Sequence, residues 1–442
     1  MRIDDFNPRG PADLVDPDTG WVSRRVFTDP DLFSLELERV FAKSWLFVGL
    51  TQEVAKRGDY VTRVMGDDPV ILSHGQDGQY RVFLNACPHR GALVCRADRG
   101  NSPSYTCPYH GWTFQNTGKL HTAADDLSCY KGRVDFTHYD LVTARTQVYG
   151  DLVFATFDDQ LPPLEEYLGD ARWYLDMFFD RTPAGLEVLG APVRWRARKN
   201  WKYGAINFAA DGPHALAAHG PITRTVLEKF GMPAEMLRDL AIAGPAVRAG
   251  NGHGMIVVPN PPGMPEFTGF PPECVALYRE HLKPGQIEVM KDMFNGVMTI
   301  FPNMSWVHFP LAFGADEPFV NFFNLRVWQP VSASETEIWS WFLADKEASE
   351  EYKQASLRIG VNTFTAAGTF DQDDSEAWAA IDAGSRGTVG KRMMSSYQMI
   401  LASEDERIPN FPGPGEAYNS TYSEMSEFGI LLEWRKRMEG VS

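Results

Sequence analysis

The sequence predicts an α+β protein whose two parts differ in their pattern of secondary structure. Residues 46–156 contain short runs of β-forming residues, such as Tyr80–Leu84, separated by turns rich in Gly and Asp, which is typical of a compact all-β domain. From residue 157 onward, helical and strand patterns mix. Residues 322–331 and 335–343 indicate two paired strands joined by a short turn.

Periodicity and turn residues predict the other elements. Apolar residues fall on one helical face over residues 30–45, which predicts a helix there. Further helices are expected at 206–230, at 350–368 and, on the surface, at 424–438. Residues 259–273 are rich in Pro and Gly, so we expect an irregular loop, either a plain connection or a lid.

The composition excludes several classes of protein. The 442 residues carry a formal net charge of −16, which argues against a nucleic-acid-binding protein. The chain has no apolar run long enough to cross a bilayer and no secretory signal, so we expect a cytoplasmic protein with no membrane partner. Five cysteines, an odd count, favour metal ligands or buried side chains over a disulfide framework.

Two loops in the β domain carry a pattern of metal-binding residues. Cys87-x-His89 and Cys107-x-x-His110 are separated by 17 residues, and a glycine that permits a tight turn follows each histidine within two residues. Two thiolates and two imidazoles suit either Zn²⁺ or a [2Fe–2S] cluster with two Cys on one iron and two His on the other. Zinc ligand pairs are usually spaced more widely than Cys87 and His89, which favours the cluster.

A second set of candidate ligands follows in the mixed part of the chain. Asp211, His214 and His219 form the pattern D-x2-H-x4-H, and two His with one carboxylate are the ligands of mononuclear Fe(II) oxygenases. On an ideal helix the two histidines would point about 140° apart, so we expect a distorted helix or a helix that starts near Gly212 and Pro213. Asp211 is the expected N-cap of that helix.

The carboxylate ligand must come from further along the chain. The acidic segment at residues 370–378 (FDQDDSEAW) supplies two candidates, Asp373 and Asp374. The same segment is also compatible with an acidic helix start whose charges simply favour the helix dipole.

These motifs, together with L-E-R-V-F-A-K-S-W at 37–45, resemble the large (alpha) subunits of Rieske non-haem iron aromatic-ring-hydroxylating dioxygenases from about residue 20 to 430. The resemblance implies an N-terminal segment (1–45) that packs on the catalytic domain, an all-β Rieske [2Fe–2S] domain (46–156), and a catalytic mononuclear iron domain (157–442) with an antiparallel sheet surrounded by helices. It also implies Asp374 as the iron ligand beside the two histidines, with Asp373 as the alternative. Asn207 and Phe208 are implied as pocket residues.

The same resemblance implies a function. The chain would be a terminal oxygenase component that uses O₂ and electrons from a ferredoxin and a reductase to cis-dihydroxylate an aromatic hydrocarbon or aromatic acid in a catabolic pathway. The alternative is a Rieske monooxygenase that hydroxylates or demethylates an aromatic substrate. Asp211 would act in catalysis by linking His214 to His110 of a neighbouring subunit, so we expect an α3 or α3β3 assembly with a small beta subunit.

Overall fold

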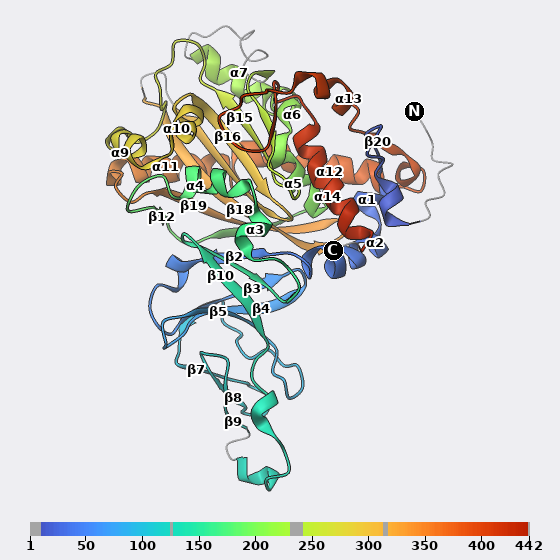
Figure 1. The fold of residues 1–442 in the computed structure, drawn as a ribbon, viewed down its shortest axis with the longest axis vertical. Helices are drawn as coiled ribbons and strands as arrows, with labels where there is room; N and C mark the ends of the chain where they lie inside the picture. The colour runs from blue at the N-terminus through green and yellow to red at the C-terminus, as the bar shows by residue number, and fades with distance from the viewer. Residues whose placement is uncertain (1–9, 124–126, 230–241, 313–316, 441–442) are drawn as a thin grey trace. The chain divides into compact units, whose positions relative to one another are not determined.

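The computed structural model describes residues 10–123, 127–229, 242–312 and 317–440 (Figure 1). The chain divides into two compact units. The smaller unit is continuous and runs from Leu37 to Tyr167, whereas the larger unit combines the segment before Leu37 with the segment after Tyr167. No helix in the described ranges is long and apolar enough to cross a membrane.

The smaller unit is built on two antiparallel sheets. A seven-stranded sheet has the order β2-β11-β10-β5-β4-β3-β6, and a three-stranded sheet has the order β7-β8-β9. The predicted strand at residues 80–84 is β5, and the all-β character of this part is confirmed. The strands are β2 (Leu46–Leu50), β3 (Asp59–Met65), β4 (Asp68–His74), β5 (Tyr80–Leu84), β6 (Arg99–Asn101), β7 (Ser104–Thr106), β8 (Thr113–Gln115), β9 (Leu120–Thr122), β10 (Thr143–Tyr149) and β11 (Leu152–Thr156).

The larger unit is built on a nine-stranded antiparallel sheet. Its order is β12-β19-β18-β17-β16-β15-β14-β21, and β13 also pairs with β19. The hairpin predicted from residues 322–331 and 335–343 is β18 and β19, in which Phe323 faces Leu343. The strands are β12 (Leu186–Val188), β13 (Val193–Ala197), β14 (Ala246–Arg248), β15 (Gly254–Pro259), β16 (Met293–Ile300), β17 (Met304–Leu311), β18 (Val320–Ser332), β19 (Glu335–Asp345) and β21 (Glu416–Tyr418).

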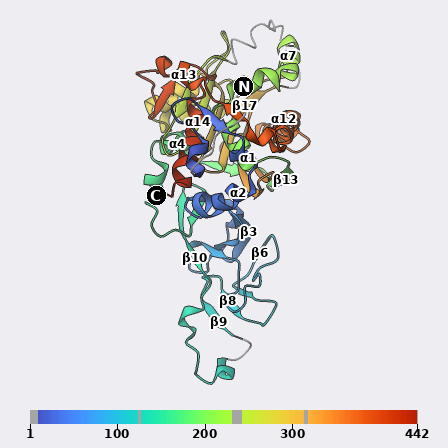
Figure 2. The same ribbon diagram turned by 90° about the vertical axis from the view of Figure 1, so that its right-hand side faces the viewer.

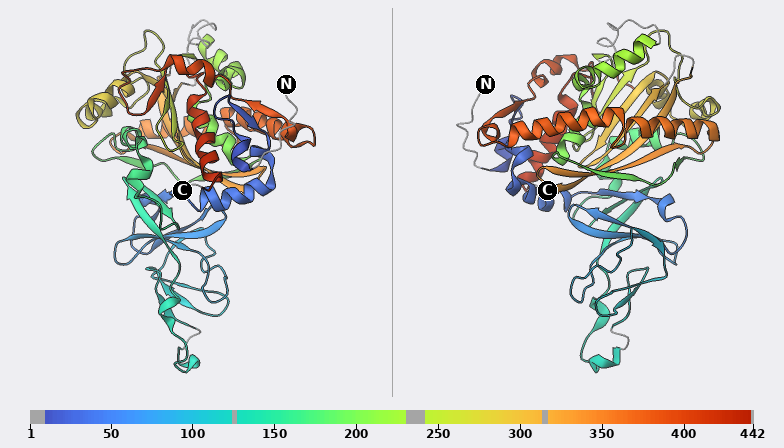
Figure 3. Two further views of the ribbon diagram at one scale, coloured as in Figure 1. Left: turned by 45° about the vertical axis from the view of Figure 1, so that its right-hand side comes forward. Right: turned by 180° about the vertical axis from the view of Figure 1, so that it is seen from behind.

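Helices surround this sheet, as predicted. In the rear view of Figure 3, the orange helices α11 and α12 run across one face of the sheet. A separate two-stranded sheet pairs β1 (Trp21–Ser23) with β20 (Met394–Ser396). The α-helices in the described residues are α1 (Arg25–Thr28), α2 (Pro30–Glu36), α3 (Leu164–Leu168), α4 (Ala171–Phe179), α5 (Trp201–Ala210), α6 (Gly212–Ala217), α7 (Gly220–Lys229), α9 (Val275–His281), α10 (Pro284–Lys291), α11 (Glu350–Thr363), α12 (Thr369–Arg386), α13 (Ile400–Ser403) and α14 (Met425–Met438).

The helix predicted at 206–230 is interrupted in the structure. Within the described residues, α5, α6 and α7 occupy this stretch, with breaks at Asp211 and at residues 218–219. The first break follows from Gly212 and Pro213, because proline cannot donate to a preceding turn and is favoured at the start of a new helix. Periodicity alone does not register such breaks, whereas Gly212 and Pro213 predicted the first one.

A buried glutamate forms polar contacts that connect three helices of the larger unit. Glu36, at the end of α2, accepts hydrogen bonds from the indoles of Trp201 in α5 (2.8 Å) and Trp434 in α14 (2.7 Å). In Figure 2, α2 is drawn in blue and α14 in red, so this contact joins early and late segments of the chain. Glu36 also pairs with the ammonium group of Lys202, which is buried as well. Because these partners satisfy the carboxylate, Glu36 can be buried in the protein interior.

The surface location predicted for the helix at 424–438 is wrong. That helix is α14, and its Phe428, Ile430, Leu431 and Trp434 are buried. α14 packs against α5 and the β14–β15 hairpin, so both apolar and several polar positions are covered. Within this helix, the guanidinium of Arg437 donates to the carboxylate of Glu433 (2.7 Å).

Candidate metal centres

The two predicted Cys/His loops share one backbone design. In the first loop, the Cys87 N–H donates to the carbonyl of Ala92 (2.9 Å), and the Gly91 N–H donates to the carbonyl of Cys87 (2.7 Å). The Cys107 loop has the equivalent bonds around Gly111. Both glycines have a φ above +70°, which glycine adopts without strain. Two matching turns therefore present one Cys and one His each.

The side chains of these loops fit a [2Fe–2S] cluster. Cys87 and Cys107 are buried, and the ring centres of His89 and His110 lie 4.6 Å apart. The Nδ1 atom of His89 is buried with no hydrogen-bond partner among the described residues, as suits a metal ligand. Burial raises the pKa of the Cys87 thiol, and the adjacent Cys107 thiol raises it further, so a metal must displace a proton to bind there.

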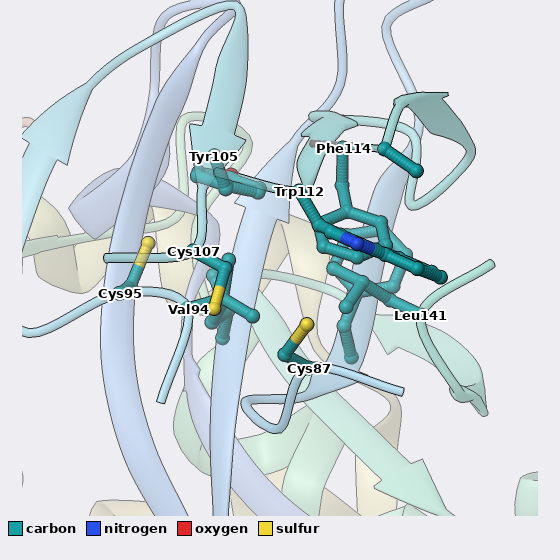
Figure 4. Packing of buried hydrophobic residues seen from close by; sticks show 11 residues of the cluster. Cys87, Val94, Cys95, Tyr105, Cys107, Trp112, Phe114 and Leu141 are labelled. Atoms are coloured by element: carbon teal, nitrogen blue, oxygen red, sulfur yellow. The ribbon is translucent and has the colours of Figure 1, made fainter. Parts of the chain in front are cut away.

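Aromatic packing supports these loops. Trp112 stacks on the His89 ring with the ring centres 4.9 Å apart, and it belongs to the buried cluster that also contains Leu141. Figure 4 shows Cys87 and Cys107 within this cluster and Cys95 standing apart from Cys87. Burial raises the pKa of the Cys95 thiol to about 12, so this thiol stays protonated and acts as an apolar side chain.

Three side chains converge in the larger unit. His214 lies in α6, His219 in the turn that follows α6, and Asp374 in α12. One ligand atom from each lies within 4.8 Å of the others. The Asp374 Oδ1 atom is 3.2 Å from the Nε2 of His219 and 3.8 Å from the Nε2 of His214. Two imidazoles and one carboxylate at one point fit a mononuclear Fe(II) that keeps open positions for O₂ and substrate.

The helix breaks resolve the geometric conflict between the two histidines. As expected, a new helix begins at Gly212, and the Asp211 carboxylate caps it by accepting from the His214 N–H (3.4 Å). α6 ends at Ala217, so His219 does not lie on the same helical surface as His214. The two side chains can therefore face one point, which an ideal continuous helix would prevent.

The Nδ1 atom of each histidine, here called the outer nitrogen because Nε2 is the one near Asp374, lies close to a second aspartate. The Nδ1 of His214 contacts the main-chain carbonyl of Asp211 and lies 3.7 Å from its carboxylate. The Nδ1 of His219 lies 3.3 Å from the Oδ2 of Asp373. Asp373 and Asp374 thus take different places, one at the outer and one at the inner nitrogen of His219. Outer contacts of this kind fix the tautomer and ring orientation of metal-binding histidines.

The charges around the three ligands favour cation binding. Burial opposes protonation of His214, but Asp211 and Asp374 outweigh it and raise the pKa of the imidazole to about 9. Burial alone would raise the pKa of Asp374, but the two histidines and Lys199 bring it below its ordinary value. Asp374 is therefore an ionised carboxylate in a buried position, which a metal ion can compensate.

A buried ion pair supports the helix that carries Asp374. Arg326 from β18 binds both oxygens of Asp371, at 2.9 and 2.6 Å, one turn before Asp374 in α12. Lys199 is buried nearby, with its Nζ 3.2 Å from the ring centre of Trp378 and no hydrogen-bond partner among the described residues. Burial lowers the pKa of Lys199 well below its usual range. The start of α12 is thus held by charge as well as by apolar packing.

An apolar pocket of about 190 Å³ reaches the three candidate iron ligands. The predicted residues Asn207 and Phe208 both line it, next to His214, His219 and Asp374. Apolar side chains of β15, β16 and β17 form much of the remaining wall, and Phe370 of α12 adds to it. Among the described lining residues there is no Arg or Lys.

Sequence reasoning missed two polar residues near this pocket. Asp373 was considered as an alternative iron ligand and not as the partner of His219. Adjacent helical residues point about 100° apart, so the Asp373–Asp374 pair could have been assigned two different roles. Asn295 of β16 also lines the pocket, and an isolated amide in a strand gave no signal that distinguished it from other asparagines.

The fold and the two donor sets define a two-centre iron oxygenase, and comparisons with known proteins agree. Residues 44–131 match the Rieske [2Fe-2S] domain family. The biphenyl dioxygenase alpha subunit of Metapseudomonas furukawaii is 35% identical over 99% of this chain and 94% of its own length. The N,N-dimethyl phenylurea N-demethylase alpha subunit of Sphingobium sp. (strain YBL2) is 34% identical over 99% of this chain and 95% of its own length.

A solved structure extends this similarity to the fold. Naphthalene 1,2-dioxygenase from Rhodococcus sp., bound to indole, superposes with a TM-score of 0.89 and 36% identity over 96% of this chain and 95% of that one. The chain belongs to the alpha subunits of the Rieske non-haem iron aromatic-ring-hydroxylating dioxygenases. Members of this family use a Rieske [2Fe–2S] cluster, a mononuclear iron and O₂.

Proposed function

We propose that this alpha subunit cis-dihydroxylates an uncharged aromatic hydrocarbon of one or two rings. The observation that carries the proposal is the apolar pocket that reaches His214, His219 and Asp374. A dry cavity of about 150 Å³ accommodates benzene. The pocket of about 190 Å³ is therefore large enough for a substituted benzene or a small bicyclic compound.

The charge of the pocket wall favours a hydrocarbon over an aromatic acid. A carboxylate buried in an apolar wall without a cationic partner is strongly destabilised. The described wall offers no Arg or Lys that could pair with a substrate carboxylate. Of the two substrate classes that the sequence predicted, the pocket thus supports the hydrocarbon.

The proposed roles follow from the positions of the side chains. Cys87, His89, Cys107 and His110 would hold the [2Fe–2S] cluster, and His214, His219 and Asp374 would hold the mononuclear iron. When bound, the cluster supplies single electrons and the iron supplies the site of O₂ activation. Asp211 and Asp373 orient the two imidazoles through their outer nitrogens. The apolar wall holds the ring and excludes water from the reaction.

We also propose an assembly of the α3 or α3β3 type in which Asp211 accepts a hydrogen bond from His110 of a neighbouring subunit. About a third of the Asp211 side chain is exposed in this chain, so the carboxylate has room for a further partner. Electrons would come from a ferredoxin and a reductase, because the sequence shows no flavin or dinucleotide fingerprint. The five cysteines form no disulfide in the structure, which is compatible with the cytoplasm, where thiols stay reduced.

Monooxygenation is the second candidate function. The relative named N,N-dimethyl phenylurea N-demethylase is about as similar to this chain as the relative named biphenyl dioxygenase. Turnover under ¹⁸O₂ separates the two reactions. Two labelled oxygens in one product molecule support dihydroxylation, and one labelled oxygen supports monooxygenation.

Metal analysis of anaerobically purified protein tests the two sites together. We expect about three irons and two acid-labile sulfides per chain, because the cluster has two irons and the second site has one. The double variant His214→Ala/His219→Ala should retain the sulfides and fall to about two irons. His281→Ala, which removes an exposed histidine outside both sites, is the matched control and should keep all three. Zinc in place of iron, or two irons in every variant, would contradict the proposal.

A further inference from the structure

A Pro- and Gly-rich loop at the surface reaches the apolar pocket. The loop spans residues 260–271 and follows β15 on the way to α9 (Figure 1). Pro262, Gly263 and Glu266 are exposed, and a Cβ added to Gly263 would meet no atom within 4 Å. Met264 lies among these residues, yet it is only partly exposed and lines the pocket. The side chain of Met264 therefore lies between the pocket and the solvent.

The backbone of this loop is held at both ends by the C-terminal end of α10. The Asn260 N–H donates to the carbonyl of Asp292 (2.7 Å), and the Phe267 N–H donates to the carbonyl of Lys291 (2.7 Å). Phe267 has a φ of +56°, and its ring centre lies 6.0 Å from that of Tyr278. A residue other than glycine keeps such a φ only where its surroundings hold it there. The two ends of the loop are thus fixed in place.

Prolines and further hydrogen bonds stiffen the segment between these ends. Pro261, Pro262 and Pro265 have restricted φ angles. The Met264 N–H donates to the carbonyl of Pro261 (3.0 Å), and the Thr268 hydroxyl donates to the carbonyl of Pro265 (2.7 Å). A backbone movement that opened the loop would break these bonds. The methionine side chain is unbranched, with three rotatable bonds, so it can turn aside while the backbone stays in place.

We propose that the side chain of Met264 gates the entry of aromatic hydrocarbons into the pocket. This inference rests on the proposed function and deepens it, because it assigns the control of substrate entry to one side chain. A gate of this kind admits a ligand only while the side chain is turned aside. If about one of the three staggered wells of a side-chain torsion clears the way, the gate slows association about threefold. The thioether is apolar, so this gate suits a hydrocarbon and requires no polar group on it.

The experiment measures the rate constants for binding of 1-fluoronaphthalene to the iron-loaded protein under anaerobic conditions, by line-shape analysis of ¹⁹F NMR spectra. Met264→Ala should raise the association and the dissociation rate constants about threefold each, and change the dissociation constant by less than about twofold. Met264→Phe places a larger and stiffer group in the entrance and should lower both rate constants. Val258→Ala is the matched control, because Val258 lines the pocket from β15. Losing this wall contact should raise the dissociation rate constant and leave the association rate constant unchanged.

An association rate constant that stays the same in Met264→Ala and in Met264→Phe would overturn the inference. A rise in the dissociation rate constant alone in Met264→Ala would also overturn it, because Met264 would then be a wall residue like Val258. Turnover of the probe with O₂ is followed in parallel and tests the proposed function separately. Oxidation of the probe without any change in association would leave the dihydroxylation in place and remove the gate. Faster association in Met264→Ala without oxidation would support the gate and contradict the dihydroxylation.

Discussion

Removing the carboxylate of Asp373 should weaken iron binding through His219. The Oδ2 of Asp373 lies 3.3 Å from the outer nitrogen of His219, and 38% of the Asp373 side chain is exposed. Losing an outer partner of a metal-binding histidine typically costs tenfold to a hundredfold in metal affinity. Because this contact is long and partly hydrated, we expect Asp373→Ala to lower the affinity for iron by about tenfold, or about 1.4 kcal/mol, which is the lower limit of that range.

The assay is competition for Fe(II) between the protein and a chelator under anaerobic conditions. The EPR spectrum of the nitric oxide complex serves as a second readout, since it reports on the orientation of the ligands. Asp373→Asn keeps an acceptor oxygen and should lose less affinity than Asp373→Ala. Glu376→Ala removes the same charge from an exposed position of α12 and should have little effect. Equal losses in Asp373→Ala and Glu376→Ala would refute the contact and indicate a long-range charge effect.

Substitutions at three further positions test buried and titrating groups through thermal unfolding. Asp371→Asn leaves Arg326 buried without a counter-charge and should cost about 3–5 kcal/mol; an unchanged midpoint would contradict this. Glu36→Ala should lower the free energy of unfolding by a similar amount because Lys202 loses its partner. Glu36→Gln keeps an acceptor oxygen and should lower it less. A larger loss in Glu36→Gln than in Glu36→Ala would contradict the role of Glu36. Burial, with the nearby carboxylate of an aspartate, raises the pKa of Glu424 to about 7 from an ordinary 4.5. The stability that Glu424 contributes is therefore fully present below pH 4.5 and is lost as the pH rises through 7. The unfolding midpoint of Glu424→Gln should therefore fall less between pH 5 and pH 8 than the midpoint of the unaltered protein. Parallel pH profiles of the two proteins would exclude this role.

Local sequence signals predicted the ligand sets more fully than their geometry. Cys87, His89, Cys107 and His110 could be recognised because short loops place ligands at fixed spacing, and the glycines after them turn as expected. His214 and His219 could be recognised as a pair, but their spacing conflicts with an ideal helix. The break after α6 that removes the conflict depends on packing between distant segments, which local periodicity does not report.

Roles that depend on tertiary contacts could not be predicted. The separate positions of Asp373 and Asp374 follow from the way α12 packs against the turn that carries His219. The burial of α14 follows from its contact with α5, whereas the sequence predicted a surface helix. In each case the decisive partner lies far away in the sequence.

The smaller unit is an insertion in the larger one, and this order bears on how the protein is made. The larger unit needs α14 to complete the buried contact between Glu36 and Trp434, and α14 leaves the ribosome late. The loops of Cys87 and Cys107 belong to a continuous segment that leaves it much earlier. Because domains fold as units during synthesis, we expect the loops of Cys87 and Cys107 to form while α12 and α14 are still being made.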